Sequence, residues 1–569
     1  MQRREFLGML AAAAAAGLPV HNLRAAARPE SGEFYHVPAK GNVHFLHMTD
    51  THAQLRPVYF REPAVNIGLG GARNRPPHLV GQHFLNEFGV EPGSINAHAM
   101  TCLDFAEAAT RYGRVGGFSH LATLVRQMRS ERPDAMLLDG GDLWQGSATA
   151  LWTRGRDMVD ASLELGVDAM TGHWEFTLGD ERVLELVEND LDGKIDFLAQ
   201  NVRDSGFGDP IFKAYTMREM NGVPVAVLGQ AFPYTPIANP SYLMPNWNFG
   251  IRESDLQDNI NAAREEGAQV VVLLSHNGMD VDLKLASQVT GLDAILGGHT
   301  HDAVPRPQVV ENDGGETIVA NGGSNGKFLG VLDFDVADGR IRDWQYRLLP
   351  VFADMLPADP DMDALITRIR EPYADKLAEE LAVTEDVLYR RGNFNGTFDQ
   401  LIVDALMEMK DADVALSPGF RWGTSLLPGD AITMERLMDQ TAITYPTTTR
   451  NDMTGERLKL VLEDVADNLF NTDPYSQQGG DMVRVGGLTY AIAPTAEMGK
   501  RIRDMRIDGE PVQADRNYRV AGWASVNDIP EGEPIWDVVG DWLRDKKTIT
   551  EREPNQPRII GLEGNKGIV

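Results

Sequence analysis

Two histidines separated by one residue, His299 and His301, stand just after the apolar run Asp293–Leu296. The run predicts a short buried strand, and the glycines that follow it predict a turn at its end. Two imidazoles presented at positions i and i+2 beyond a strand can face a single site. Imidazole is a ligand of divalent metals, so this segment predicts one side of a metal site.

The same arrangement recurs upstream, where an apolar run is followed directly by aspartate or histidine. The runs and the polar residues after them are Phe45–Thr49 with Asp50 and His52, Ala135–Asp139 with Asp142, and Val270–Leu274 with His276. Open α/β sheets place their sites at the carboxyl ends of their strands. Carboxylates and imidazoles together suit Mn, Fe or Zn. The four strands therefore predict a divalent metal site at one edge of an α/β sheet.

The composition limits the classes of function. A chain of 569 residues, of which 43% are hydrophobic, is long enough for more than one domain with a packed core. Its formal net charge of −30 argues against nucleic acid or an anionic membrane as a partner, because like charges repel. The single cysteine, Cys102, excludes a disulfide within the chain.

The first 27 residues predict an export signal. Arg3-Arg4 precedes an apolar stretch from Gly8 to Leu18, and Ala25–Ala27 supplies small residues for cleavage. The apolar stretch has about eleven residues, which is too short to span a bilayer that needs roughly 20. We therefore predict a twin-arginine signal, delivery of the folded protein to the periplasm, and no stable membrane insertion.

The remainder of the chain predicts two α/β domains. Alternating strands and helices indicate a layered α/β catalytic domain over residues 42–354, with an insertion at 60–112 that we expect to act as a lid or docking element. Asp359 as N-cap and Pro360 at the first helical position predict a helical linker over 355–381, which Pro372 should interrupt. A substrate-binding domain should then occupy residues 382–569.

Taken in order, the motifs resemble those of the dinuclear metallophosphoesterases, and within them the two-domain periplasmic 5′-nucleotidases. The matching segments are Asp50-x-His52, Gly140–Asp142, Gly172–Phe176, Ser275–Gly278 and Gly298–His301, together with Ser417–Arg421 and Thr454–Leu458 in the second domain. The resemblance implies a calcineurin-like catalytic domain followed by a 5′-nucleotidase-like α/β domain.

The resemblance also assigns the ligands of two divalent ions. One ion would be bound by Asp50, His52 and His301. The other would be bound by His173, His276 and His299, and Asp142 would bridge both ions.

One segment departs from the nucleotidase pattern, which is Gly-Asn-His-Glu-Phe-Asp. This chain has Gly172-His173-Trp174-Glu175-Phe176-Thr177, so Trp174 replaces the catalytic histidine of the pattern and Thr177 replaces the aspartate that orients it. An alkoxide leaving group needs help from an acid. A sulfur leaving group does not, since even a plain thiol has a pKa of about 8.5. The segment therefore favours a sulfur substrate over a nucleotide.

This variant, with the insertion and the signal, resembles the SoxB family of thiosulfohydrolases of the periplasmic Sox sulfur-oxidising system. The resemblance implies two Mn²⁺ ions, with Zn²⁺ as the alternative, and a metal-bridging hydroxide that releases sulfate from a cysteine S-thiosulfonate. The substrate would be borne on the C-terminal cysteine arm of the carrier SoxYZ, and other Sox proteins would be further partners. The expected catalytic residues are Asp142, His173, Trp174 and Arg421, and the expected substrate contacts are Trp174, Asn201 and Arg421.

Two other functions stay open. One is a periplasmic 5′-nucleotidase or cyclic-nucleotide phosphodiesterase, which would need an aromatic pair in the second domain to hold a base, with Phe420 and Tyr475 as candidates. The other is a non-catalytic scaffold of the sulfur-oxidising complex, although a scaffold has no need for open metal positions. Turnover of a carrier-bound thiosulfonate would separate the three.

Overall fold

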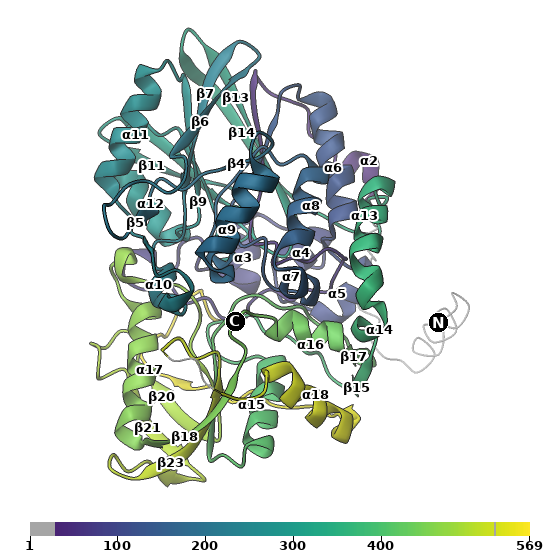
Figure 1. Cartoon of the computed structure of the whole chain (residues 1–569), viewed down its shortest axis with the longest axis vertical. Coiled ribbons are helices and arrows are strands. Elements are labelled where there is room, and N and C mark those ends of the chain that lie inside the picture. Colours follow the sequence, from purple (N-terminus) through teal and green to yellow (C-terminus); the bar gives the residue numbers. More distant parts are fainter. Residues whose placement is uncertain (1–28, 528–530) are drawn as a thin grey trace, which may run out of the picture.

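The computed structural model describes residues 29–527 and 531–569, so the export signal predicted for residues 1–27 lies outside the described residues. The first domain contains two six-stranded sheets (Figure 1). The strand order of the first sheet is β14 (Arg340–Pro350), β13 (Phe328–Ala337), β1 (Val43–Met48), β2 (Met136–Asp139), β3 (Ala169–Met170) and β4 (Asp196–Phe197). The order of the second sheet is β11 (Gln308–Asn312), β12 (Gly315–Asn321), β10 (Ala294–Gly297), β9 (Val270–Ser275), β7 (Val223–Gln230) and β6 (Tyr215–Met220).

The central strands of both sheets are parallel and covered on both faces. β1 and β9 are buried at every position, and β1, β2 and β3 pair in parallel, as do β9 and β10. Strands buried on both faces favour continuous apolar sequence rather than alternation. The run at Val270 supplies it, whereas β1 also buries His44 and His47. Parallel pairing brings the carboxyl ends of these strands to the same side of each sheet.

Helices flank the two sheets (Figure 1). Those of the first domain are α6 (Phe118–Glu131), α7 (Ala148–Thr153), α8 (Arg156–Leu165), α9 (Asp180–Leu186), α10 (Thr235–Ala238), α11 (Glu253–Glu265) and α12 (Met279–Gln288). After α9 ends at Leu186, residues Val187–Leu191 continue the helix as a π-helical turn.

The insertion at 60–112 contains helices that the sequence analysis did not predict. They are α3 (Gly81–Phe88), α4 (Ile95–Met100) and α5 (Phe105–Tyr112). Each is only about two turns long, and such short helices depend on tertiary packing rather than on sequence periodicity. Buried side chains such as Phe84, Leu85 and Tyr112 supply that packing against the first-domain core.

The last residues of the chain return to the insertion. Asn66 N–H donates to the carbonyl of Gly567 over 2.7 Å, Val80 N–H donates to Lys566, and Val569 N–H donates to Ala64. Ile67 joins a hydrophobic cluster formed otherwise by the second domain and the end of the chain. The insertion is therefore bonded to both domains and does not project freely from the first.

The linker has the predicted cap and interruption. The Asp359 side chain accepts the backbone N–H of Met362, and Pro360 begins α13 (Pro360–Arg370). A 3-10 turn over Glu371–Tyr373 contains Pro372 and separates α13 from α14 (Ala374–Leu377). β15 of the second domain then begins at Glu380.

The second domain has three small sheets. The strand order of the first is β17 (Ala431–Thr433), β15 (Glu380–Thr384) and β24 (Thr548–Ile549). The order of the second is β18 (Thr448–Thr454), β23 (Asn517–Trp523), β16 (Val414–Ser417) and β19 (Arg484–Gly486). The order of the third is β22 (Glu510–Pro511), β21 (Ile502–Ile507), β20 (Leu488–Ile492) and β25 (Arg558–Ile559). Its longer helices are α15 (Thr397–Met409), α16 (Met434–Thr441), α17 (Gly455–Phe470) and α18 (Ile535–Lys546).

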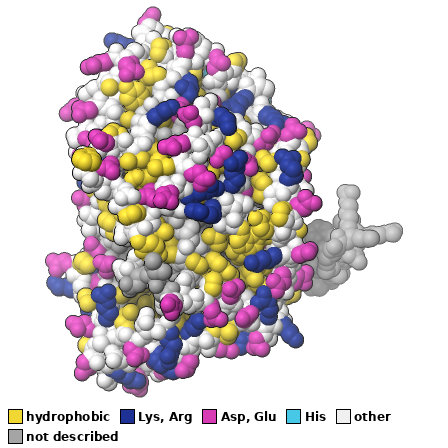
Figure 2. All heavy atoms as spheres, in the orientation of Figure 1, with side chains coloured by type: hydrophobic (Ala, Val, Ile, Leu, Met, Phe, Trp, Pro, Cys, Tyr) yellow, Lys and Arg dark blue, Asp and Glu magenta, His cyan; other side chains and the backbone are white. Residues whose placement is uncertain are grey.

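The surface carries interspersed acidic and basic side chains, and hydrophobic side chains gather at the level where the two domains meet (Figure 2). Across residues 29–527 and 531–569, the structure contains no helix with the length and apolarity that a membrane span requires.

A buried ion-pair network holds the first sheet at the end opposite the predicted site. The Asp333 carboxylate accepts from Arg132 Nε at 2.8 Å, from Arg132 Nη2 at 2.9 Å, from His44 Nδ1 at 2.8 Å and from Gln345 Nε2 at 2.7 Å. Burial alone would raise the pKa of Asp333, but these hydrogen bonds lower it to about 2. The network joins β1, β13, β14 and the segment after α6.

We predict that Asp333→Asn destabilises the first domain by about 3–5 kcal/mol, because it leaves the Arg132 guanidinium buried without a carboxylate. The pKa of Asp333 is about 2 in the folded protein and about 3.9 in the unfolded chain. Ionisation of Asp333 therefore stabilises the fold fully when the pH is above about 3.9, and this stabilisation is lost as the pH falls through about 2. Unfolding should thus show the full difference in stability between wild type and variant at pH 7 and a smaller difference at pH 2.5. The exposed Asp343→Asn is the control, with an expected cost of about 0–1 kcal/mol; an equal cost for both variants would contradict the prediction.

Candidate metal centre

Seven acidic and histidine side chains meet where the carboxyl ends of the two sheets converge. They are Asp50 and His52 after β1, Asp142 after β2, His173 after β3, His276 after β9, and His299 and His301 after β10. All seven are buried. These are the residues that the sequence analysis selected as metal ligands.

The seven side chains form two groups that share one member. One group contains Asp50, His52, Asp142 and His301, and the other contains Asp142, His173, His276 and His299. Within each group, one ligand atom from every residue lies within 4.8 Å of the others. Asp142 belongs to both groups, so its carboxylate can bridge two ions.

The backbone of these residues is unusual for side-chain-bearing positions. Asp50, His52, Asp142, His299 and His301 all have positive φ, between 46° and 72°. A non-glycine residue held in this region costs of order 1–3 kcal/mol and persists where the surrounding structure over-determines it. The turns after β1, β2 and β10 therefore store strain in order to direct these side chains inward.

The close contacts in the site are between groups that attract a cation. His52 Nε2 and His301 Nε2 are 3.0 Å apart, and His301 Nε2 lies 3.2 Å from Asp50 Oδ1. His173 Nδ1 lies 3.2 Å and His276 Nε2 3.1 Å from Asp142. Both ring nitrogens of His299 are buried without a hydrogen-bond partner in the described part of the chain. Buried lone pairs that face one another in this way fit divalent cations.

The protonation of the imidazoles supports the same conclusion. Burial is the main cause that lowers the pKa of His52 to about 4 and those of His299 and His301 well below the usual value. Their rings are thus neutral at pH 7, as metal ligands must be.

His276 is the exception, because it faces both carboxylates. Burial would lower its pKa, but the charges of Asp142 and Asp50 raise it to about 10. Its Nδ1 lies 2.5 Å from the carbonyl of Gly140, which fixes Nε2 toward Asp142. The two carboxylates therefore favour positive charge at this position.

Aromatic rings cover two of the candidate ligands. Trp422 of the second domain stacks on His52 with ring centroids 5.6 Å apart, and Phe232 stacks on His299 at 4.0 Å. The indole N–H of Trp422 is buried and has no partner in the described part of the chain. Sequence reasoning missed both residues, since nothing local marks a ring that is brought to the site by long-range packing.

Trp174 lies beside the site at the junction of the domains. Its backbone N–H donates to Asp142 Oδ1 over 2.9 Å. Its indole packs edge-on against Trp422 at 4.8 Å and parallel to Tyr445 at 6.1 Å. Thr177 donates its hydroxyl proton to the carbonyl of Trp174 over 2.8 Å. Neither side chain at these two positions can act as an acid.

Two arginines of the second domain approach the site. Arg421 Nη2 donates to the carbonyl of Gly480 at 2.8 Å, while its Nη1 has no partner in the described chain. Arg391, which sequence reasoning missed, donates to the carbonyl of Thr300 at 3.0 Å, and its Nε is likewise unpartnered among described residues. No carboxylate of the described chain lies within ion-pair distance of Arg391. Both guanidiniums have N–H groups left for an anion.

Asn201, an expected substrate contact, uses both ends of its side-chain amide within the protein. Its amide nitrogen donates to the carbonyls of Ala231 and Gly250, and its oxygen accepts the N–H of Ala231. These bonds hold the segment after β7 that carries Phe232. Asn201 therefore stabilises the backbone next to Phe232, the ring that stacks on His299.

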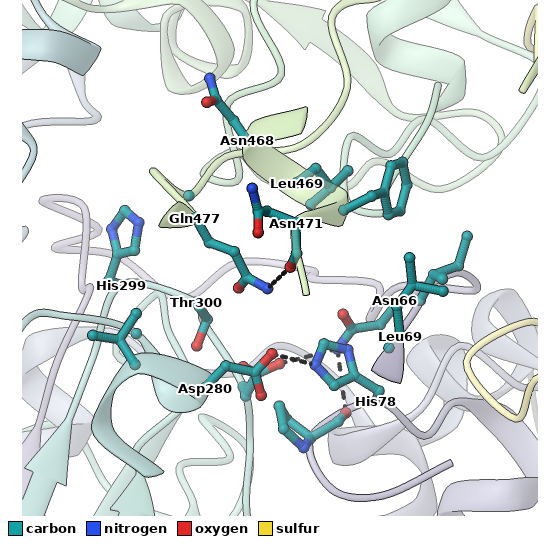
Figure 3. Close-up of a pocket in the computed structure, with 18 of the residues that line it drawn as sticks. Asn66, Leu69, His78, Asp280, His299, Thr300, Asn468, Leu469, Asn471 and Gln477 are labelled. Carbon is teal, nitrogen blue, oxygen red and sulfur yellow. Dashed lines mark hydrogen bonds and ion pairs between the residues drawn. The ribbon is translucent and has the colours of Figure 1, made fainter. Parts of the chain in front are cut away.

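A pocket that His299 helps to line lies beside this centre (Figure 3). It has a volume of about 50 Å³ and is bounded by three parts of the chain: the insertion, the first domain and the second domain. Asn66 and His78 line it from the insertion, Asp280 and His299 from the first domain, and Gln477 from the second domain. His78 Nε2 and Asp280 Oδ2 are 2.9 Å apart, so an ion pair ties the insertion to α12 at this pocket.

A glycine of the second domain lies against His299. A Cβ at Gly479 would stand 1.9 Å from His299 Nε2, and the residue has a φ of 77°. Only glycine fits there, because a side chain would meet the imidazole and the backbone is left-handed. The loop that carries Gly479 is anchored to the first domain by Tyr475, which donates to Glu253 Oε1 over 2.5 Å.

We predict that Asp142→Ala abolishes binding of both ions, because one carboxylate serves both groups and offsets the repulsion between two cations. Elemental analysis of the purified variant should find far fewer than two ions per chain. The exposed Asp192→Ala is the control and should keep the wild-type content. Two ions still bound to Asp142→Ala would remove Asp142 from the bridging position.

Comparison with known proteins finds two family matches along the chain. Residues 43–303 match the calcineurin-like phosphoesterase family, and residues 381–526 match the 5′-nucleotidase C-terminal domain. Among curated proteins, the 5′-nucleotidase of Bos taurus is 25% identical over 457 residues, which is 71% of this chain and 76% of that protein. These matches confirm the predicted calcineurin-like and 5′-nucleotidase-like α/β fold.

Solved structures extend the match over nearly the whole chain. The sulfate thiohydrolase SoxB of Thermus thermophilus, solved in complex with glycerol, is 38% identical, with a TM-score of 0.88 over 93% of this chain and 98% of that one. A 5′-nucleotidase precursor, also of Thermus thermophilus, is 20% identical, with a TM-score of 0.72 over 91% and 99% of the two chains, and shares the fold. The chain is therefore a metal-dependent hydrolase of the two-domain 5′-nucleotidase superfamily and belongs within it to the SoxB family.

Proposed function

We propose that this hydrolase removes the terminal sulfonate from a cysteine S-thiosulfonate carried by another protein. Water supplies the oxygen, the bond between the outer sulfane sulfur and the sulfonate sulfur breaks, and sulfate is released. The carrier keeps a persulfide, and the two protons of water pass to solvent. Membership of the SoxB family supports the reaction class, since the Thermus thermophilus relative is described as a sulfate thiohydrolase.

The observation that carries the proposal is the chemistry of the segment beside Asp142. Trp174 and Thr177 supply no acid, because the indole is packed between aromatic rings and the hydroxyl is bonded to the backbone. An alkoxide cannot leave readily without a proton, whereas a persulfide can leave as an anion. The site is thus suited to a sulfur leaving group.

The residues of the chain have distinct tasks in this proposal. Two divalent ions, for which we propose Mn²⁺ with Zn²⁺ as the alternative, would lower the pKa of bound water and polarise the sulfonate oxygens. The carboxylates of Asp50 and Asp142 with the five histidines would hold the ions. The unpartnered N–H groups of Arg391 and Arg421 would pair with the sulfonate, since guanidinium binds such anions bidentately. Trp174 and Trp422 would exclude water on the side of His52.

The substrate is small but tethered, so the path to the ions must admit an extended chain. The pocket between the insertion, α12 and the loop of Gln477 has the required position, because it reaches His299 and Arg421. We propose that the C-terminal cysteine arm of the carrier SoxYZ enters there and that the insertion faces the carrier. The enzyme would meet this carrier in the periplasm, after twin-arginine export.

A nucleotidase function has less support. Phe420, one candidate for holding a base, stacks on Trp422 with ring centroids 4.0 Å apart. Tyr475, the other candidate, lies under the Lys284 ammonium at 3.8 Å and bonds Glu253. Each ring already has partners within the protein, and no ring contact joins the two among the described residues. The contacts of these two rings therefore give no support to a base-binding slot between them.

We predict that the double change Trp174→His with Thr177→Asp raises hydrolysis of a phosphomonoester such as AMP by about 10-fold. This is less than the 10²–10⁴ of an optimised general acid, because the aromatic packing around Trp174 is lost as well. Sulfate release from a thiosulfonate peptide should fall in the same variant. Steady-state rates on both substrates, at equal metal content, provide the measurement.

The matched control for this prediction is Trp174→Phe with Thr177→Val, which changes the packing without adding an acid and should show no gain on AMP. A wild-type enzyme that already cleaves AMP as fast as dedicated nucleotidases would contradict the argument from the missing acid.

A further inference from the structure

One buried carboxylate beside the metal centre accepts an unusual number of backbone hydrogen bonds. Glu175 is fully buried. Its Oε1 accepts the N–H of Leu143 at 2.6 Å and of Trp144 at 3.3 Å. Its Oε2 accepts the N–H of His173 at 2.7 Å and of Asp142 at 3.3 Å. Four amides from two separate loops therefore converge on a single side chain.

The two loops are the ones that carry the bridging carboxylate and a histidine of the second ligand group. Asp142 follows β2, His173 follows β3, and the backbone N–H of Trp174 closes the arrangement by donating to Asp142 Oδ1 at 2.9 Å. Asp142 has a φ of 58°, and Gly141 before it has a φ of 94°. Such a backbone persists only where its surroundings over-determine it, and the Glu175 carboxylate provides four of the bonds that do so.

We infer that Glu175 is a positioning residue for the metal centre, which fixes the separation and orientation of Asp142 and His173 so that both ion sites are formed before metal arrives. It does so as an internal anion that collects the amides of both loops. The inference concerns metal binding and holds whichever substrate the enzyme uses, so its failure would leave the proposed thiosulfonate reaction standing.

The chemistry of the side chain explains why an acid is required here. A carboxylate has two acceptor oxygens and no donor, which matches four N–H groups. Glutamine at this position would place an NH₂ group against two of the amides, and those amides would lose their acceptor inside the protein. A buried donor left unsatisfied in this way is costly, so the loops would shift apart and relax the strained turn at Asp142.

The test is a titration of metal-free protein with Mn²⁺ by calorimetry, combined with thermal unfolding of the metal-free and loaded forms. Glu175→Gln should bind Mn²⁺ about 10–100-fold more weakly, which is the usual effect of losing an outer-shell partner. The rise in unfolding temperature on Mn²⁺ loading should shrink accordingly. The control Glu185→Gln, at an exposed position on α9, should match the wild type in both measurements.

Each other outcome counts against the inference. Two Mn²⁺ ions bound to Glu175→Gln with wild-type affinity would overturn it. The inference would also be overturned if Glu175→Gln were less stable but its unfolding temperature rose on Mn²⁺ loading by as much as that of the wild type. Glu175 would then have only a structural role.

A second variant keeps the inference testable if Glu175→Gln does not fold. Glu175→Asp retains the charge but is one methylene too short to reach both loops, so its Mn²⁺ affinity should fall while that of Glu185→Gln does not. Failure of both Glu175 variants to fold even with Mn²⁺ present would mark Glu175 as a folding residue and refute a specific role at the metals.

Discussion

The structure depends on one constraint, which is that two cations must be held a few ångströms apart in a buried site. Two like charges at that distance repel strongly where water is scarce. The chain meets this constraint by placing Asp142 in both ligand groups and Asp50 beside it, so that negative charge lies between and next to the ions. The pKa of His276 is raised by the charges of the same two carboxylates, which favour positive charge beside them.

The second domain completes this site as well as bounding it. Trp422 stacks on His52, and Gly479 lies against His299. Arg391 donates to the carbonyl of Thr300, the residue between His299 and His301. The insertion and the end of the chain bond to each other, and the Tyr475 loop bonds the first domain. Contacts at several separated points therefore hold the two domains in the arrangement in which the ligands are covered.

The sequence predicted those features that local patterns encode. Six ligand positions follow from apolar runs that end near Asp or His, since parallel strands bring their carboxyl ends together, whereas His173 was assigned through the family resemblance. The structure brings all seven side chains into one site. The cap at Asp359 and the break at Pro372 are likewise local and were predicted. Spacing alone does not show which ligands bind which ion. That assignment to two ligand groups came from the resemblance to a known family.

Features that arise from contacts distant in sequence were not predicted. Arg391 and Trp422 reach the site from the second domain, and nothing near them in sequence marks their proximity to His301 or His52. Asn201 has the sequence context of a site residue after a strand, yet its amide is used by the backbone of Ala231 and Gly250. The helices of the insertion are too short to show a periodicity of their own, and they form because the first domain and the tail pack against them.

The central claim is that this metal centre releases sulfate from a thiosulfonate borne on a protein thiol. It is tested most directly by mixing the metal-loaded enzyme with a SoxYZ carrier whose arm cysteine bears the thiosulfonate, and by following sulfate together with the intact mass of the carrier. The account predicts one sulfate per modified carrier and a carrier left with a persulfide, whereas metal-free enzyme should give neither. Sulfate release that is unaffected by metal removal, or an unchanged carrier in the presence of an enzyme that rapidly hydrolyses AMP, would contradict it.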